Sequence, residues 1–72
     1  MDIHVDCKPG IGGELEPAVV WFGRRRLLVR SILDRWYGRG RRWWKLDTED
    51  GVYVLRLDED SGKWELAAVV RT

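Results

Sequence analysis

Residues 20–46 read VWFGRRRLLVRSILDRWYGRGRRWWKL, and this stretch decides how the chain folds. It contains nine of the thirteen basic residues of the chain and one acidic residue, Asp34. It also contains four of the five tryptophans, at positions 21, 36, 43 and 44. Arginines interleaved with aromatic residues are typical of a core with a solvated rim, or of a surface that binds an anion. The function depends on which of these two arrangements the fold produces.

The first part of the stretch predicts a hairpin. Residues 18–22 form a short β-rich run after Pro17, and a proline is tolerated at the first residue of a strand. Gly23-Arg24 then predicts a type II′ turn, in which glycine takes the first central position.

Residues 25–37 fit two templates. Hydrophobic residues alternate as in a strand, yet a helical stripe with a period near four also fits. The segment has no N-cap and is rich in residues of middling helix propensity. It therefore predicts a long strand that bends or bulges near Arg30-Ser31, so that burial passes from Leu27 and Val29 to Ile32. A short helical turn at residues 31–35 is the alternative.

Two more hairpins follow the glycine loop at residues 38–40. Residues 41–48 predict a strand with Trp44 and Leu46 on one face and Trp43 and Lys45 on the other. Asp-Gly at residues 50–51 predicts a type I′ turn. Residues 52–58 form the next strand, and Gly62 suits the left-handed position of the last turn. Residues 63–71 predict the last strand, whose inward side chains are Trp64, Leu66 and Ala68.

The first sixteen residues form a separate segment. Residues 1–8 alternate weakly, and the Gly-rich run at residues 9–13 breaks any regular element. Residues 1–16 are therefore either an edge strand or a flexible tail with a linker, and residues 17–72 are a small β-barrel domain. The predicted fold is all-β: an antiparallel five-stranded meander in a partly open SH3-like barrel, with an optional N-terminal edge strand.

Composition sets the broad class. Seventy-two residues suffice for one domain, and five Trp, two Tyr and one Phe supply bulk for a small core. The single cysteine, Cys7, excludes an intrachain disulfide. There is neither a signal-peptide pattern nor an apolar run long enough to span a membrane, so we expect a cytoplasmic protein without a membrane partner.

Charge is distributed unevenly along the chain. Residues 1–16 carry one lysine and four acids, a net charge of −3, whereas residues 17–45 carry nine basic residues and one acid, a net charge of +8. Residues 46–72 carry three basic residues and seven acids, a net charge of −4. This asymmetry indicates either a surface that binds a partner or arginine–carboxylate pairs across strands.

Spaced Trp, Gly and hydrophobic positions carry a resemblance to a known family. Within residues 17–70 they are Trp21, Gly23-Arg24, Val29, Ile32-Leu33, Trp36, Trp43 to Leu46, Gly51 to Tyr53, Leu55, Asp60, Gly62, Trp64 and Leu66. The pattern resembles a small bacterial domain of unknown function that occurs alone and at the C-terminus of ImuB-like Y-family DNA polymerase proteins. The resemblance implies an association with DNA repair and supplies no catalytic residues.

Catalysis and cofactors have little support in the sequence. His4 is the only histidine, and it lies in the N-terminal segment without a predictable partner. His4, Asp6 and Cys7 fall short of the four ligands of a structural zinc site. Gly10 to Gly13 lacks the lysine and helix of a phosphate loop. We therefore expect a non-enzymatic module without cofactor or metal.

The basic, aromatic surface is the candidate site. Two arginine groups follow two turns, and a bent strand could bring them to one end of the barrel. The candidate nucleic-acid-binding residues are Arg24, Arg25, Arg26, Tyr37, Arg39, Arg41, Arg42 and Trp43. Trp21, Trp36, Trp44 and Trp64 are instead expected in the core. The expected partner is single-stranded DNA or a DNA-repair protein.

Protein–protein interaction is the alternative function. Hydrophobic residues such as Val19, Phe22, Val54 and Val69 fall on the face opposite the predicted core. Burial on two sides would require a homodimer or another protein partner.

Overall fold

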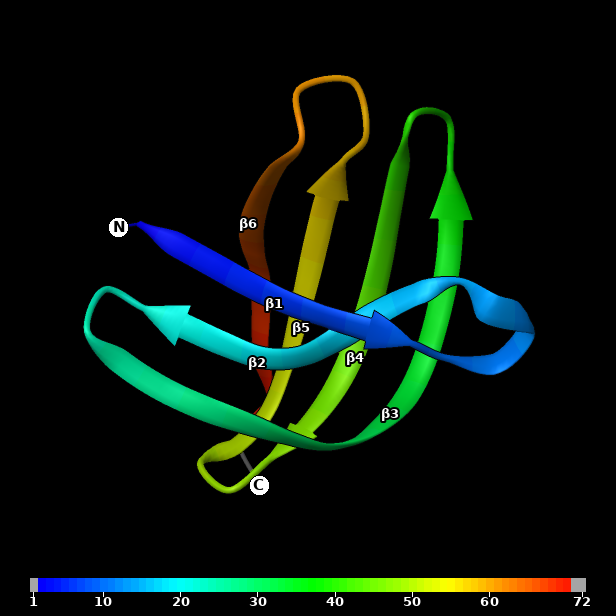
Figure 1. The fold of residues 1–72 in the computed structure, drawn as a ribbon. Coiled ribbons are helices and arrows are strands. Elements are labelled where there is room, and N and C mark those ends of the chain that lie inside the picture. The colour runs from blue at the N-terminus through cyan, green and yellow to red at the C-terminus, as the bar shows by residue number, and fades with distance from the viewer. Residues whose placement is uncertain (1, 71–72) are drawn as a thin grey trace.

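The computed structural model describes residues 2–70 as one antiparallel sheet of six strands in the order β1-β2-β3-β4-β5-β6 (Figure 1). A three-residue 3-10 turn, η1 (Ile11–Gly13), joins the first two strands. The strands are β1 (Ile3–Pro9), β2 (Leu15–Phe22), β3 (Arg25–Gly38), β4 (Arg41–Thr48), β5 (Gly51–Asp58) and β6 (Lys63–Val70). The all-β antiparallel meander is confirmed, and the optional N-terminal strand is present as β1.

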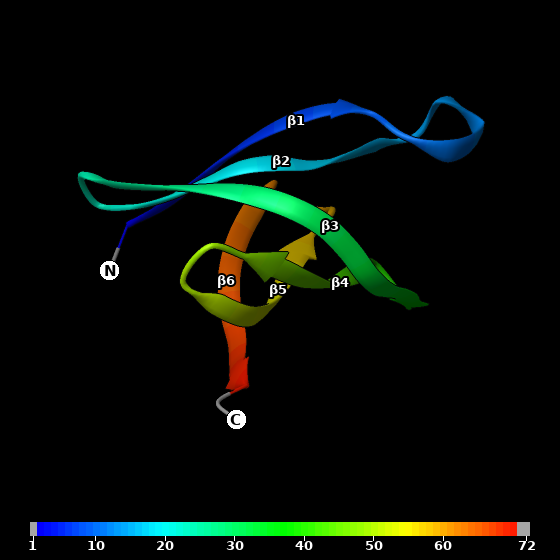
Figure 2. The same ribbon diagram turned by 90° about the horizontal axis from the view of Figure 1, so that it is seen from below.

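The sheet curls into a half-barrel with two layers (Figure 2). β1 and β2 pair with the first part of β3, whereas the second part of β3 pairs with β4 and continues through β5 to β6. β3 therefore belongs to both layers. The sheet order places β1 and β6 at opposite edges, with no ladder between them within residues 2–70.

The bend in β3 is where the sequence predicts it. The β3–β4 register shifts between Val29 and Ser31 and again between Ile32 and Asp34. Extra residues at such bulges bend a strand and increase its twist. Leu27 is buried, and Val29 and Ile32 pack on the core, so the inward face passes through the bulge as expected. The alternative helical turn at residues 31–35 is wrong, because this segment is strand throughout.

The core lies between the two layers. Its cluster of buried residues consists of Val5, Val20, Trp44, Leu46 and Leu55. Trp64 packs against this cluster, with its ring centroid 5.1 Å from that of Trp44. These two tryptophans fill the space that small aliphatic side chains would leave in a chain of this length.

Two of the four tryptophans expected in the core lie outside it. Trp36 is exposed, and Trp21 is half-buried and outside the core cluster. Trp21 pairs with His4 and Arg26 on the outer side of the first layer, since its neighbour Val20 points inward. Ala68, also expected to face inward, is exposed.

The turns agree with the predicted positions but not always with the predicted types. Gly23 has φ 60° while no described non-glycine residue has a positive φ, which fits the type II′ expectation for Gly23-Arg24. Gly62 has φ 71°, the left-handed value expected. The type I′ turn at Asp50-Gly51 is wrong, because it requires a positive φ at Asp50 as well. Thr48 holds this turn instead: its Oγ1 donates to the carbonyl of Gly51 and accepts from the amide of Asp50.

β2 begins earlier than expected, at Leu15, so that Pro17 lies inside the strand. Pro17 pairs with Cys7 beside a bulge in β2, where Ala18 has no partner in β1, and no β3 residue pairs with Pro17. A bulge tolerates a residue without an amide donor. Within residues 2–70, no helix is long and apolar enough to cross a membrane.

Candidate nucleic-acid interface

The outer face of β4 alternates basic and aromatic side chains. Trp44 and Leu46 are buried, so the intervening residues Arg41, Trp43 and Lys45 point away from the core, as predicted from the alternation. On β5, Arg56 is the cross-strand partner of Trp43 and binds Glu65 of β6. Three neighbouring strands thus present one solvent-facing surface.

Two indole rings stack on this surface. Trp36 of β3 is paired with Trp43, and their rings lie 6.3 Å apart between centroids and only 7° from parallel. Trp36 is 39% exposed. The Trp43 ring lies over Gly38, where an added Cβ would come within 2.7 Å of Cζ3. The absence of a side chain at Gly38 is therefore what allows the ring to lie flat on β3.

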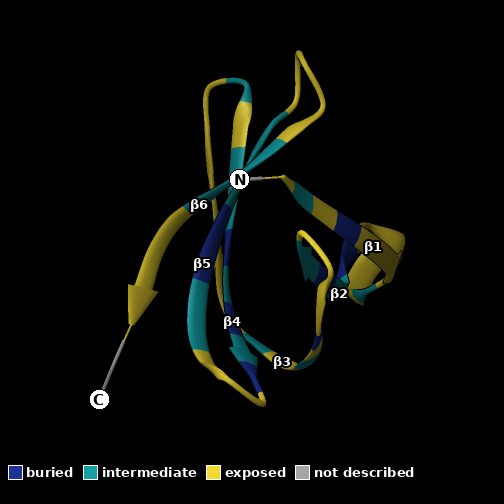
Figure 3. Cartoon of the chain, turned by 90° about the vertical axis from the view of Figure 1, so that its left-hand side faces the viewer, coloured by how far each residue is buried: buried dark blue, intermediate teal, exposed yellow. Residues whose placement is uncertain are grey.

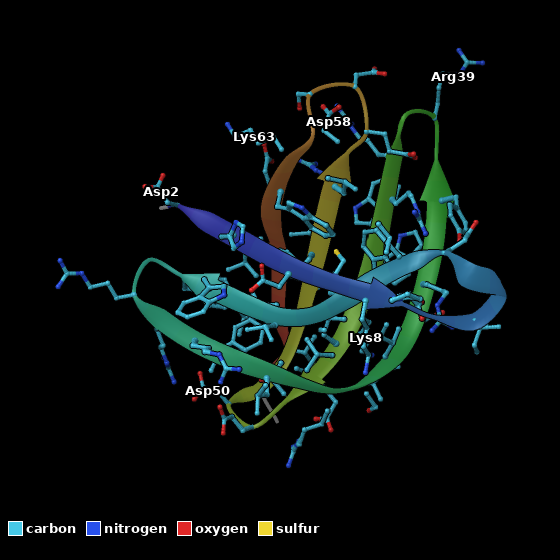
Figure 4. The ribbon with its side chains drawn as sticks, in the orientation of Figure 1. Asp2, Lys8, Arg39, Asp50, Asp58 and Lys63 are labelled. Atoms are coloured by element: carbon cyan, nitrogen blue, oxygen red, sulfur yellow. The ribbon has the colours of Figure 1, made fainter. Side chains whose placement is uncertain are left out.

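Basic side chains surround the indole pair. Arg39 extends from the tip of the β3–β4 hairpin, away from the body of the protein (Figure 4). Within residues 2–70, Arg39, Arg41 and Lys45 form no ion pair. Acids do lie across the strands, since Asp58 is paired with Arg41 and Asp34 with Lys45. Acids also lie at the hairpin tip, because the backbone amide of Glu59 donates to the Gly40 carbonyl and an added Cβ at Gly40 would lie 3.5 Å from Oδ2 of Asp60. The surface therefore has mixed charge both at the tip and along the strands.

Arg42 and Tyr37, two predicted site residues, do not belong to this surface. The Arg42 side chain is 17% exposed and lies 4.6 Å above the Trp44 ring. It donates to Glu14, and so does the Tyr37 hydroxyl, at 2.8 Å. These contacts tie the segment after η1 to the β3–β4 hairpin. Cation–π contacts and charge pairing of this kind stabilise the fold and leave little of Arg42 for a ligand.

The arginines of the other hairpin are also elsewhere. Arg25 binds Asp50 at 2.7 Å, and Asp50 lies at the end of the molecule opposite Arg39 (Figure 4). Arg26 lies over the Trp21 ring, and Arg24 is exposed at the hairpin tip. The expectation that the two arginine groups meet is wrong, because β3 has fourteen residues and separates them along its whole length.

The predicted pairing of arginines with carboxylates across strands is confirmed for many of the basic residues. Besides those of Arg25 and Arg42, ion pairs join Arg30 to Asp47, Arg35 to Glu16 and Arg56 to Glu65. The acids come from segments on either side of the basic stretch, which explains the uneven charge along the chain.

Sequence reasoning missed Trp36 and Lys45 as site residues. The position of Lys45 beside Trp43 was evident from strand alternation. The two-residue turn between Gly38 and Arg41 pairs Trp36 with Trp43. Trp36 lies on the outer face because a second bulge, between Ile32 and Asp34, follows the one that the sequence predicts near Arg30-Ser31.

The N-terminal histidine lies in a small polar cluster on the outer side of β1. Trp21 Nε1 donates to Asp6 at 3.0 Å, and His4 Nε2 lies 2.8 Å from the other carboxylate oxygen. The hydrogen bonds from Trp21 and then from His4 hold the pKa of Asp6 below its usual value. Cys7 is an exposed residue, yet partial burial of its thiol and the nearby Asp6 charge raise the pKa of that thiol. A raised pKa reduces the thiolate fraction, the opposite of what a nucleophilic cysteine needs.

Within the described chain, no group of three His, Cys, Asp or Glu side chains is arranged to hold a metal ion. Comparison with family models, curated proteins and solved structures found no match.

Proposed function

We propose that the outer face of β3 and β4 binds single-stranded nucleic acid. The supporting observation is the Trp36–Trp43 stack, with Trp36 exposed, which lies beside basic side chains that form no ion pair within residues 2–70. Parallel rings on a sheet surface offer an apolar plane on which an unpaired base can continue the stack. Stacking accepts any base, so this interface would show little sequence preference.

Phosphate contacts fall to Arg39, Arg41 and Lys45. Arginine forks match phosphate oxygens, and a hairpin tip can follow a flexible backbone. Three contacts give an expected slope of about −2 for log K against log salt, since each single-strand contact contributes about −0.7. Asp34 and Asp58 lie across from two of the three basic residues and limit how many phosphates the face can hold.

The proposal is tested by titrating a fluorescently labelled oligothymidine into the protein at several salt concentrations. Replacing Trp36 by Ala removes an outer stacking plane, and base–aromatic stacking contributes about 1–3 kcal/mol per base. The dissociation constant should therefore rise about 5- to 150-fold. Trp fluorescence of the wild type should be quenched on binding.

A matched pair of double variants separates this face from general basicity. Arg39→Ala with Arg41→Ala should weaken binding and flatten the salt slope, whereas Arg24→Ala with Arg26→Ala removes equal charge at the opposite hairpin and should change it little. Equal losses in both pairs would show that charge alone attracts DNA. Unchanged binding by Trp36→Ala would exclude the stacking surface.

The proposal also covers the type of barrel and the cellular setting of the protein. The long bent β3, shared between two layers, supports assignment to the partly open SH3-like barrels. A non-enzymatic, cytoplasmic module associated with DNA repair would use such a face to hold a transient single strand.

A further inference from the structure

The β5–β6 turn lies against the tip of the β3–β4 hairpin. The two turns stand side by side at one end of the molecule (Figures 1 and 3). The backbone amide of Glu59 donates to the carbonyl of Gly40 at 2.9 Å, and this hydrogen bond joins the two turns directly. Since only backbone atoms form the bond, a change of the Glu59 side chain leaves both of its atoms in place.

Carboxylates are concentrated in the β5–β6 turn. Asp58, Glu59 and Asp60 are consecutive, and residues 59–63 are all exposed. Asp58 stabilises the turn, because its Oδ1 accepts hydrogen bonds from the amides of Asp60 and Ser61 at 3.1 and 3.4 Å. The carboxylates of Glu59 and Asp60 form no ion pair within residues 2–70. No ion pair of the fold therefore uses these two side chains.

The carboxylates of the turn lie beside the arginines of the proposed interface. An added Cβ at Gly40 would lie 3.5 Å from Oδ2 of Asp60, and Gly40 stands between Arg39 and Arg41 in the chain. Arg41 is also the cross-strand partner of Asp58. The two arginines carry a charge of +2 and the three consecutive acids a charge of −3, so the two turns together carry −1.

This excess of negative charge opposes the approach of a phosphate. Charges closer together than the Debye length, about 8 Å at physiological ionic strength, retain much of their interaction. A phosphate bound by either arginine would lie beside the carboxylates of the turn and be repelled by them. In the absence of a ligand, each carboxylate can also attract a neighbouring guanidinium, with which it forms a strong hydrogen bond.

We propose that Glu59 and Asp60 compete with phosphate for the arginines of the β3–β4 tip, so that the β5–β6 turn limits the affinity of this face for nucleic acid. This inference rests on the proposed function and concerns the regulation of the same site. A strand that binds displaces the turn carboxylates from Arg39 and Arg41. The turn thereby selects against polyanions that offer charge alone, and it favours strands that also stack an unpaired base on Trp36.

Titration of labelled oligothymidine into the double variant Glu59→Gln with Asp60→Asn tests the inference. Both changes remove a charge and keep the shape of the side chain. The dissociation constant should fall about 5-fold at low salt, because two unit charges at about 8 Å from a phosphate act additively in water. The gain should shrink as salt is added. Duplex DNA of the same length, which offers no unpaired base, should gain at least as much.

Glu49→Gln is the matched control for Glu59→Gln. Glu49 is also an exposed glutamate of a hairpin turn without an ion pair, and it adjoins Asp50 at the end opposite Arg39 (Figure 4). The control removes the same charge and should change the affinity little. When Arg39 and Arg41 are both replaced by Ala, neutralising the turn should give no gain, since the arginines that it frees are absent.

Three results would overturn competition by the turn. They are an unchanged dissociation constant in the double variant, equal gains in Glu49→Gln and Glu59→Gln, and a gain that persists without the two arginines. In each case, wild-type binding that still depends on Trp36 leaves the proposed function intact. Loss of that dependence, or no oligothymidine binding by the wild type and the double variant, refutes the proposed function and this inference together.

Discussion

At the scale of single residues, the arginines differ in how deeply the carboxylate that each one binds is buried. Arg35 donates to Glu16 at 2.6 Å, and the Glu16 side chain is only 9% exposed. Arg30 also binds an acid, Asp47, but both groups lie nearer the solvent. Exposed ion pairs contribute little to stability, whereas a carboxylate buried without its partner is costly. Two arginines of the same strand therefore have different roles.

Replacing Arg35 by Ala should destabilise the fold more than replacing Arg30 by Ala. The first change leaves the Glu16 carboxylate partly buried and unpaired, and we expect a loss of about 1–3 kcal/mol in the free energy of unfolding, reduced by the solvent that reaches Arg35. The second should cost about 0–1 kcal/mol. Urea denaturation followed by Trp fluorescence measures both.

The two arginine variants share a strand and a chemical change. Arg30→Ala also removes a hydrogen bond of 3.0 Å to the carbonyl of Thr48, so a larger loss in Arg35→Ala would be due to the burial of the acid. Equal losses would mean that the Glu16–Arg35 pair is no stronger than a surface ion pair.

At the scale of elements, the hairpin turn, a bulge and a glycine together form the site on β3 and β4. The turn between Gly38 and Arg41 sets the register that pairs Trp36 with Trp43, the bulge between Ile32 and Asp34 returns Trp36 to the outer face, and Gly38 leaves room for the Trp43 ring. A side chain at position 38 would occupy the space of the Trp43 ring. The stack is therefore a property of the hairpin and of neither tryptophan alone.

Gly38→Ala should displace the Trp43 ring while the hairpin persists. The new Cβ would lie 2.7 Å from Cζ3 of Trp43, a distance that requires the ring to move. Stacked indoles give an exciton couplet in the far-ultraviolet circular dichroism, and this signal should weaken. Ser31→Ala, an exposed residue of the same strand, serves as the control.

Trp36→Phe supplies the reference for complete loss, because the Trp44–Trp64 contact also contributes to the spectrum. A Gly38→Ala spectrum identical to that of the wild type would show that Trp43 does not rest on the glycine.

At the scale of the whole molecule, the first strand forms one edge of the half-barrel. Val5 is 9% exposed and belongs to the core cluster, where it is paired with Val20 of β2. β1 thus belongs to the first layer and supplies part of the buried core cluster. Residues 1–16 could be read from sequence as either a strand or a tail, and the strand is what the fold requires.

Val5→Ala should cost about 1–3 kcal/mol in the free energy of unfolding, since it removes two buried methyl groups and leaves a cavity. Leu28→Ala, at a residue that is 46% exposed, is the control and should cost less than about 1 kcal/mol. Thermal unfolding compares the two. A Val5→Ala variant as stable as the control would show that β1 is dispensable to the core.

The features of the fold that could be predicted from the sequence are those that depend on local residue patterns. Strand alternation identified Trp44 and Leu46 as core, the glycines marked the hairpins, and the mixed periodicity of residues 25–37 located the bend. The turn at Asp50 was predicted in place and wrong in type, because the Thr48 side chain stabilises a conformation that the Asp-Gly pair does not by itself favour.

The candidate site was predicted only in part, because some of its properties depend on residues that are far apart in the sequence. Trp43, Arg39 and Arg41 lie where alternation and the glycine loop put them, but Arg24 and Arg42 do not share their surface. Whether an arginine is free depends on an acid from another strand, as Glu14 shows for Arg42.

The sequence by itself determined the strands from residue 41 onward, the hairpin order and the inward side chains of β4, because these depend on a period of two residues and on local turn chemistry. Only the tertiary structure decided that Trp36 lies outside and that the two arginine groups lie apart. Those outcomes depend on the register across a bulged pair of strands and on the length of β3, which no single segment encodes. The stretch of residues 20–46 is therefore partly core, partly ion-pair scaffold and, at the β3–β4 hairpin, an exposed surface of stacked indoles and basic side chains.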